Sequence, residues 1–381
     1  MLEELGVRRV INATGVLTVL GGSVIDDEVL AAMEEVAKVY VDVPELQVKA
    51  GEYLSKLLGV EAAFVTSGAA AGLVLSMAAC MTLGKQEDMA RLPRTEGIKK
   101  NEAVVQKLHR NMYDYNLEIA GARIVEAGSK DGTTEADLEG SISQRTAAVV
   151  YFMFDPQEHV LPLADVIRIA HSHEVPVIVD AAAENPPTEN LWKFNKMGAD
   201  IVLFSGGKDL RGMNNSGLLL GRKDLVQYCA RLGPHSYEQS RTGLRVFIGR
   251  PMKVSKEGIV GLVAAVKKYL QTDQSARLTE WDKEADYIVS ELSGCKGVTV
   301  RKMMPVNIDH PRPMTIPKVE ITTKLSKLTP ENMEQELRNG NPSIHAYSME
   351  GKLYVNPQCL LEGDERIVAK KLRELLDNIV L

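Results

Sequence analysis

The sequence predicts an α/β protein with a mostly parallel sheet in a large domain and a smaller α+β domain towards the C-terminus. Between residues 100 and 210, short apolar runs rich in Val, Ile and Ala alternate with helical segments. Continuously apolar strands of this kind are typical of parallel sheets that helices cover on both faces. The chain has 381 residues. A single hydrophobic core seldom supports a chain of this length, so about two domains are expected.

The elements of the large domain follow in order. Residues 27–58 have helical periodicity that is interrupted at Pro44. A short apolar strand then leads through a Thr-Ser-Gly turn into an Ala-rich helix. Later strands are predicted in the runs AVVQKL, ARIVEAG, AAVVYFMF, VPVIVDAAAE and ADIVLFSGG.

The pattern changes from about residue 255, where one long helix or a pair of helices is predicted. Strand-like VTVRKMM, PKVEITTKL and KLYVNP follow, and an amphipathic helix begins near Asp364. We therefore expect three parts: an N-terminal segment, 1–48, that packs on both domains, a large α/β domain, 49–255, and a small α+β domain, 256–381.

Composition excludes several classes of function. The net charge of −6 gives no global attraction to nucleic acid or to an anionic membrane, and no apolar stretch is long enough to span a bilayer. The four cysteines, Cys80, Cys229, Cys295 and Cys359, form no CxxC pair, so we expect neither a metal site nor a disulfide framework. A cytoplasmic protein is expected.

The first chemical motif is the turn TSGAAAG, Thr66 to Gly72, between a strand and a helix. Exposed N–H groups and the dipole at a helix start attract anions, and small residues let a phosphate approach the backbone. Thr66 and Ser67 add hydroxyl groups that could bind an anion, and Gly68 and Ala69 stand where the helix begins. Many strand-to-helix turns have this composition only in order to turn, so the motif by itself leaves both interpretations open.

The second motif is Asp180, which ends the apolar strand in VPVIVDAAAE. A carboxylate there is costly unless a positive group meets it. It is either a helix cap or the partner of a buried pyridine nitrogen.

The third motif is Lys208, in ADIVLFSGGKDLRG after the next buried strand. Lysines usually lie on solvated surfaces. Desolvation lowers the pKa of a lysine and favours a Schiff-base amine. The alternative, a phosphate-loop lysine, lacks the GxxxxGK[ST] pattern.

Together the three motifs have the order found in fold-type I enzymes that use pyridoxal 5′-phosphate (PLP). That resemblance implies a mostly parallel sheet of the seven-stranded type, with the motifs at its carboxyl edge. It implies that Thr66, Ser67, Gly68, Ala69 and Ser205 bind the cofactor phosphate, that Asp180 binds the ring nitrogen, and that Lys208 forms the Schiff base.

The chain further resembles the selenocysteine-synthase-like (L-seryl-tRNA selenium transferase-related) branch of fold-type I. The matching segments are RRVINATG at 8–15, VTSGAAAG at 65–72, AGARIVEAG at 120–128, IVDAAAE at 178–184, SGGKDLRG at 205–212 and GRPMKVSKE at 249–257. Only seven residues precede RRVINATG, where the family's transferases carry a tRNA-binding domain. We therefore expect a small-molecule amino substrate, not tRNA, as in the short relatives such as D-glucosaminate-6-phosphate ammonia-lyase.

Further site residues follow from the same resemblance. His109 is the candidate to stack on the cofactor, with a structural histidine as the alternative. Arg250 and Lys253, together with Arg211 and Arg312, are candidates to bind a substrate phosphate or carboxylate. Arg250 and Lys253 could equally belong to a solvated basic loop. The resemblance also implies a homodimer or larger homo-oligomer.

The predicted function is a PLP-dependent lyase that removes a Cα proton and eliminates a β-substituent, of the ammonia-lyase or dehydratase type. The substrate is a small hydroxy-amino acid or a sugar amino acid. Alternatives that keep the cofactor are selenium or sulfur transfer, racemisation and aldol cleavage. A non-enzymatic binding protein is disfavoured because Asp180 and Lys208 are both present.

Overall fold

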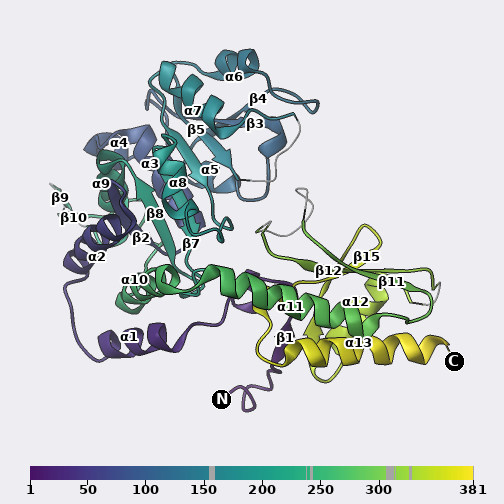
Figure 1. Ribbon diagram of the computed structural model, residues 1–381. Coiled ribbons are helices and arrows are strands. Elements are labelled where there is room, and N and C mark those ends of the chain that lie inside the picture. Colours follow the sequence, from purple (N-terminus) through teal and green to yellow (C-terminus); the bar gives the residue numbers. More distant parts are fainter. Residues whose placement is uncertain are drawn as a thin grey trace. The chain divides into compact units, whose positions relative to one another are not determined.

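The computed structural model describes residues 1–153, 159–236, 238–240, 243–305, 313, 315–325 and 328–380 (Figure 1). They form two compact units. Unit 1 combines Met1–Val24 with Asp273–Leu381, and unit 2 is Ile25–Thr272. These borders differ from the expected ones at 48 and 255, because residues 25–48 and 256–272 belong to the large unit.

Unit 2 is built on the expected sheet, and its seven strands confirm the fold class. In spatial order they are β2 (Ala62–Thr66), β8 (Gly217–Gly221), β7 (Ile201–Ser205), β6 (Val177–Asp180), β5 (Thr146–Phe152), β3 (Glu102–Gln106) and β4 (Arg123–Ala127). Only β8 runs antiparallel to its neighbours, β2 and β7; the other pairs are parallel.

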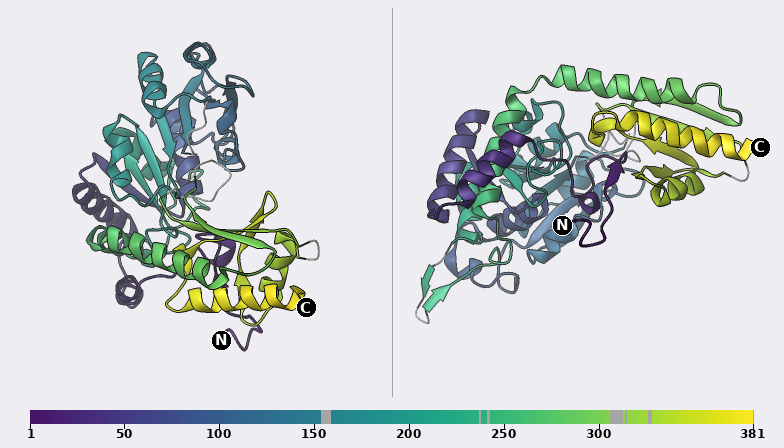
Figure 2. Two further views of the ribbon diagram at one scale, coloured as in Figure 1. Left: turned by 45° about the vertical axis from the view of Figure 1, so that its right-hand side comes forward. Right: turned by 90° about the horizontal axis from the view of Figure 1, so that it is seen from below.

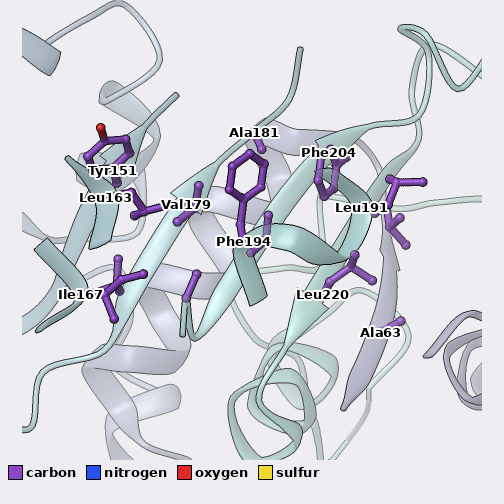
Figure 3. Packing of buried hydrophobic residues seen from close by; sticks show 14 of the residues in the cluster. Ala63, Tyr151, Leu163, Ile167, Val179, Ala181, Leu191, Phe194, Phe204 and Leu220 are labelled. Carbon is purple, nitrogen blue, oxygen red and sulfur yellow. The ribbon is translucent and has the colours of Figure 1, made fainter. Parts of the chain in front are cut away.

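Helices cover both faces of this sheet. Their bounds are α1 (Asp27–Ala37), α2 (Val43–Leu58), α3 (Ala69–Thr82), α4 (Gln86–Met89), α5 (Tyr115–Ile119), α6 (Glu135–Ser141), α7 (Leu163–Ser172), α8 (Asn190–Lys196), α9 (Lys223–Leu232) and α10 (Lys256–Gln271). One core layer joins the sheet to α2, α6, α7, α8 and α10, and Figure 3 shows part of it. The second layer joins the sheet to α3, α4, α5 and α9. A two-stranded ribbon, β9 (Glu238–Ser240) and β10 (Gly243–Arg245), follows α9 (Figure 2).

The helical segment 27–58 is divided as its proline predicts. Pro44 lies in the first turn of α2, where a missing N–H costs nothing. The Asp42 carboxylate accepts a hydrogen bond from the Glu45 N–H at 2.8 Å and caps the helix.

Helices α1 and α10 pack against each other, which explains why the large unit extends to Thr272. Gly261 of α10 allows this packing: a Cβ there would lie 2.9 Å from Cγ of Met33. Lys256 of α10 donates to the carbonyls of Val36 and Ala37 at the end of α1. Sequence periodicity located α10 but could not show which core it joins.

Unit 1 contains a four-stranded antiparallel sheet with helices on one face. The strands in spatial order are β11 (Val298–Met303), β12 (Lys318–Thr323), β15 (Lys352–Val355) and β14 (Tyr347–Met349). The core beneath them includes residues of α11 (Gln274–Leu292), α12 (Pro330–Asn339) and α13 (Asp364–Val380). The three predicted strands and the terminal helix of this region are confirmed.

The N-terminal segment RRVINATG folds into unit 1. Strand β1 (Val10–Asn12) pairs in parallel with β13 (Ser343–His345). Two short 3₁₀ helices of unit 1 are Thr18–Leu20 and Pro357–Cys359, and a third, Lys107–His109, belongs to unit 2. Gly15 has φ +100, and a Cβ there would lie 2.4 Å from Nδ2 of Asn356. The glycine of this motif is therefore required for packing. None of the helices in the described ranges has the length and apolar character that crossing a bilayer requires.

Candidate functional site

The strands that lead to Thr66, Asp180, Ser205 and His109 end at the same edge of the sheet of unit 2. Strands β2, β6 and β7 run in the same direction and end at Thr66, Asp180 and Ser205. His109 follows the parallel strand β3 in a short 3₁₀ helix. Carboxyl ends of parallel strands are where open α/β sheets bind ligands.

The turn at Thr66 to Ala69 forms an open cradle at the start of α3. Gly68 has φ +135, and a Cβ there would meet no atom within 4 Å. Across the turn the backbone is crowded: a Cβ on Gly217 would lie 2.5 Å from the carbonyl carbon of Gly68. The Thr66 hydroxyl donates to the Gly68 carbonyl at 2.8 Å and fixes the turn. Ser67, Gly68 and Ala69 remain partly exposed, so an anion could reach the N–H groups of the first turn.

Asp180 and Lys208 influence each other electrostatically. Burial raises the pKa of the Asp180 carboxyl, and the Ala182 N–H and the positive charge of Lys208 act in the opposite direction. The Ala182 N–H donates to Oδ1 at 3.0 Å and orients the carboxylate. A protonated ring nitrogen near Asp180 would add a third favourable interaction for its ionised form.

The turn around Lys208 is tight, and its glycines are needed. The Gly206 N–H donates to the Ser216 carbonyl at 2.8 Å, and the Gly212 N–H donates to the Gly206 carbonyl at 2.8 Å. A Cβ on Gly207 would lie 2.3 Å from Cα of Asn214. Lys208 and Ser205 are half-buried. The side chain of Lys208 therefore extends from a tightly hydrogen-bonded turn at a partly buried edge of the sheet.

His109 is buried, with 1% of its surface exposed. Burial lowers the pKa of its imidazole to about 4, so the ring is neutral at physiological pH. Its ring lies edge-on to Tyr151, with 4.6 Å between centroids and 86° between planes. Sequence reasoning missed Tyr151 because it lies inside an apolar strand run. Its place near the end of β5, the neighbour of β6, is the signal that could have found it.

The candidate anion-binding residues have different positions. Arg250 is half-buried and Lys253 is exposed. Burial is the main cause that lowers the pKa of His235, and the charges of Arg250 and Lys253 lower it further, so both cations act on that imidazole. Nη2 of Arg211 is 3.2 Å from Oδ1 of Asp26. Arg312 lies outside the described residues. In the described ranges, no group of three or more His, Cys, Asp or Glu side chains could hold a metal ion.

These residues fit PLP. The open space at Gly68, at the start of a helix, suits a phosphate. A carboxylate and an amine within electrostatic reach of each other suit the ring nitrogen and the aldehyde.

Known proteins resemble this chain over almost its full length. The SelA family, described as L-seryl-tRNA selenium transferase, matches residues 10–279. A D-glucosaminate-6-phosphate ammonia lyase of Salmonella typhimurium is 30% identical over 99% of this chain and 98% of its own. A 5′-C-glycyluridine monooxygenase-decarboxylase of a Streptomyces species is 32% identical over 98% and 91%.

Solved structures agree with this relationship. The structure of a D-glucosaminate-6-phosphate ammonia-lyase superposes with a TM-score of 0.83 at 29% identity and covers 100% of this chain and 99% of its own. A cysteine desulfurase from Thermococcus onnurineus shares the fold, with a TM-score of 0.61 at 16% identity over 97% and 95%. The chain therefore belongs to the SelA family and has the fold-type I architecture of PLP enzymes.

Proposed function

We propose that this protein is a PLP-dependent lyase that removes the Cα proton of an amino substrate and eliminates a β-substituent. The observation that carries the proposal is the electrostatic pair of Asp180 and Lys208 at the carboxyl edge of the sheet. The full-length similarity to an ammonia lyase supports elimination as the reaction. The substrate class is a small hydroxy-amino acid or a sugar amino acid.

Each residue of the proposed site has its own role in this reaction. Bound PLP would supply the electron sink for the carbanion at Cα. The amine of Lys208 is the base that takes the Cα proton, since its turn holds it at the edge where the substrate would be. Asp180 keeps a positive charge on the ring nitrogen. The neutral His109, buried against Tyr151, remains the candidate ring beside the cofactor. The N–H groups of Ser67 to Ala69 and the hydroxyls of Ser67 and Ser205 hold the phosphate, while Thr66, whose hydroxyl donates to the Gly68 carbonyl, shapes the turn.

The substrate's anionic group is proposed to bind to Arg250 and Lys253, with Arg312 as a further candidate. The support is chemical: both cations act on the same imidazole, His235, whose pKa is lowered chiefly by burial and further by the charges of Arg250 and Lys253. A glycine or methionine replacement at either position would raise KM for an acidic substrate and leave PLP binding intact.

A cofactor test decides the first part of the proposal. Purified protein is mixed with PLP, reduced with borohydride and digested, and the labelled peptide is identified by mass spectrometry. We expect a visible absorption band and a label on Lys208. Lys208→Ala should lose both, while Lys223→Ala, which removes an exposed lysine at the start of α9, should keep both. A colourless protein with no label on Lys208 would refute the cofactor assignment.

A product assay decides the reaction. Candidate D- and L-hydroxy-amino acids and sugar amino acids are incubated with the loaded protein, and ammonia and keto acid are measured. Equal amounts of both confirm elimination. An aldehyde would indicate aldol cleavage, the opposite enantiomer would indicate racemisation, and a selenium- or sulfur-containing product would indicate transfer.

A second candidate reaction is oxidative decarboxylation. It is favoured by the similarity to the monooxygenase-decarboxylase of Streptomyces, which is as close as the similarity to the ammonia lyase. The same incubations separate the two reactions, since decarboxylation by a monooxygenase consumes O₂ and releases CO₂, whereas elimination does neither.

We also propose a homodimer or larger homo-oligomer in the cytoplasm, with no tRNA substrate. The segment between α1 and α2 and the outer face of α2 expose apolar side chains: Tyr40 104%, Val48 58%, Tyr53 45% and Leu57 37%. Such a surface supports a protein interface. Sedimentation should show an oligomer that Val48→Asp weakens and that Lys130→Asp, an exposed position after β4, leaves intact. No tRNA binding is expected from a chain of net charge −6.

A further inference from the structure

The turn that carries Lys208 holds a non-glycine residue in an unfavourable backbone conformation. Arg211 has φ +57, a left-handed conformation that side chains other than glycine rarely adopt. Its N–H donates to the carbonyl of Lys208 at 3.0 Å. The backbone of Arg211 is therefore linked directly to that of Lys208, and some other interaction has to hold Arg211 in place.

One such interaction is an ion pair with Asp26. Nη2 of Arg211 lies 3.2 Å from Oδ1 of Asp26, and both side chains are partly buried. Asp26 stands at the N-cap position of α1, yet its carboxylate makes no capping hydrogen bond to that helix. Aspartate is among the favoured capping residues, so the orientation towards Arg211 replaces its usual local role.

Helix α1 is a firm attachment point because α10 holds it at both ends. Lys256 donates to the carbonyls of Val36 and Ala37 at 2.7 and 3.1 Å. At the first turn of α1, Lys268 pairs with Glu28. Figures 1 and 2 show the two helices side by side.

The turn of Lys208 rests on the same helix α10. A Cβ on Gly206 would lie 2.7 Å from Cδ1 of Leu262, and a Cβ on Gly212 would lie 3.3 Å from Cβ of Ala265. The turn therefore packs on α10 through its glycines, and the Arg211–Asp26 ion pair attaches it to α1.

We propose that Arg211 is a positioning residue: its ion pair with Asp26 fastens the turn of Lys208 to α1 and holds the amine where the PLP aldehyde would meet it. This inference rests on the proposed role of Lys208. It assigns Arg211 to the protein's own carboxylate, in place of the substrate anion.

Four variants of the full chain test the proposal. Asp26→Asn and Arg211→Gln each remove the ion pair, and the double variant removes both partners. Arg211→Gly removes the ion pair but tolerates the left-handed backbone, so it separates loss of the pair from backbone strain. Glu28→Gln is the matched control, because it removes the other ion pair of the first turn of α1 and keeps the charge of Lys268, which acts on Asp26, in place.

Three measurements are made on each variant: the melting temperature, amide hydrogen exchange of residues 208–212 without PLP, and the dissociation constant of PLP. Asp26→Asn, Arg211→Gln and Arg211→Gly should each exchange roughly tenfold faster in this turn than the wild type. They should bind PLP roughly tenfold more weakly, and the double variant should be no worse than the single ones. Glu28→Gln should resemble the wild type in exchange and PLP affinity.

Several outcomes would overturn the proposal. If Arg211→Gly binds PLP as the wild type does, Arg211 has only a backbone role. If Arg211→Gly weakens PLP but Asp26→Asn does not, Arg211 acts on the ligand itself. If Glu28→Gln loosens the turn equally, the effect belongs to the docking of α1. Should the wild type bind no PLP, the proposed function fails, while hydrogen exchange still reports whether the ion pair holds the turn.

Discussion

Lys318 places an amine in the interior of unit 1. The residue is fully buried, and its Nζ has no hydrogen-bond partner within the described ranges. Burial lowers the pKa of this amine to about 7, against 10.5 for an exposed lysine. In the unfolded chain the amine is protonated up to about pH 10.4, so between these values the unfolded state binds more protons and stability rises with pH.

Replacement of Lys318 by methionine should therefore stabilise the protein, and more at pH 7 than at pH 9.5. A shift of one pKa unit corresponds to about 1.4 kcal/mol, so the two gains should differ by as much as about 3 kcal/mol. Urea unfolding at both pH values measures this difference. Lys324→Met is a suitable control at the end of the same strand. Equal gains at the two pH values would contradict the assigned pKa.

Glu284 of α11 is predicted to show the opposite pH dependence. Burial and the neighbouring carboxylates Glu365, Glu280 and Asp364 raise the pKa of Glu284 to about 8. The folded state then binds this proton more tightly than the unfolded state, so stability falls as pH rises from about 4.3 to 8.

Glu284→Gln should remove that loss. Since the residue keeps some contact with water, the expected gain at pH 9 is about 1–2 kcal/mol, and the variant should match the wild type at about pH 4. Thermal unfolding across this pH range measures the effect, with Glu291→Gln on the same helix as the control. A gain that does not grow with pH would exclude the titration of Glu284 as its cause.

At the scale of elements, one lysine of α10 binds the C-terminal end of α1. The amine of Lys256 lies among three carbonyls at the end of α1: those of Val36, Ala37 and Val39. Cations at the C-terminus of a helix satisfy its last carbonyls and interact favourably with its dipole.

Lys256→Met should lower the free energy of unfolding by about 1–3 kcal/mol, the usual value of charge-assisted hydrogen bonds that are lost. Urea unfolding gives this value. Lys267→Met, an exposed position on the same helix, should be neutral. An equal loss in both variants would mean that α10 tolerates no methionine on its surface, and that the carbonyl contacts of Lys256 contribute nothing specific.

At the scale of the whole molecule, each unit has its own core. Among the residues that the structure describes, the two core layers of unit 2 contain no residue of unit 1, and the core of unit 1 contains none of unit 2. The phosphate turn, Asp180 and Lys208 all belong to unit 2.

PLP should therefore stabilise unit 2 directly. At a free concentration of 100 times the dissociation constant, the ligand adds about 2.7 kcal/mol to its stability. Hydrogen exchange with and without PLP should show protection within residues 25–272, first around Gly68, Asp180 and Lys208. Lys208→Ala should reduce this protection. Protection confined to residues 273–381 would place the cofactor elsewhere.

The sequence by itself determined the parallel sheet, the family, and the motifs at Thr66, Asp180 and Lys208. Apolar runs separated by helical segments and by glycine-rich turns are local features of the sequence, and such features can be recognised without a structure. The predicted α/β fold and the resemblance to the SelA family are confirmed, while the roles of the individual site residues stay predictions.

Only the tertiary structure decided the rest. It placed residues 25–48 and α10 in the large unit and showed that β8 runs antiparallel to its neighbours. It also showed that Tyr151 contacts His109 and that Asp26 pairs with Arg211. Asp26 and Arg211 are far apart in the sequence, and nothing in the residues around either one reveals the partner. Burial and long-range pairing depend on the whole chain, because desolvation and ion pairing arise only when distant elements meet.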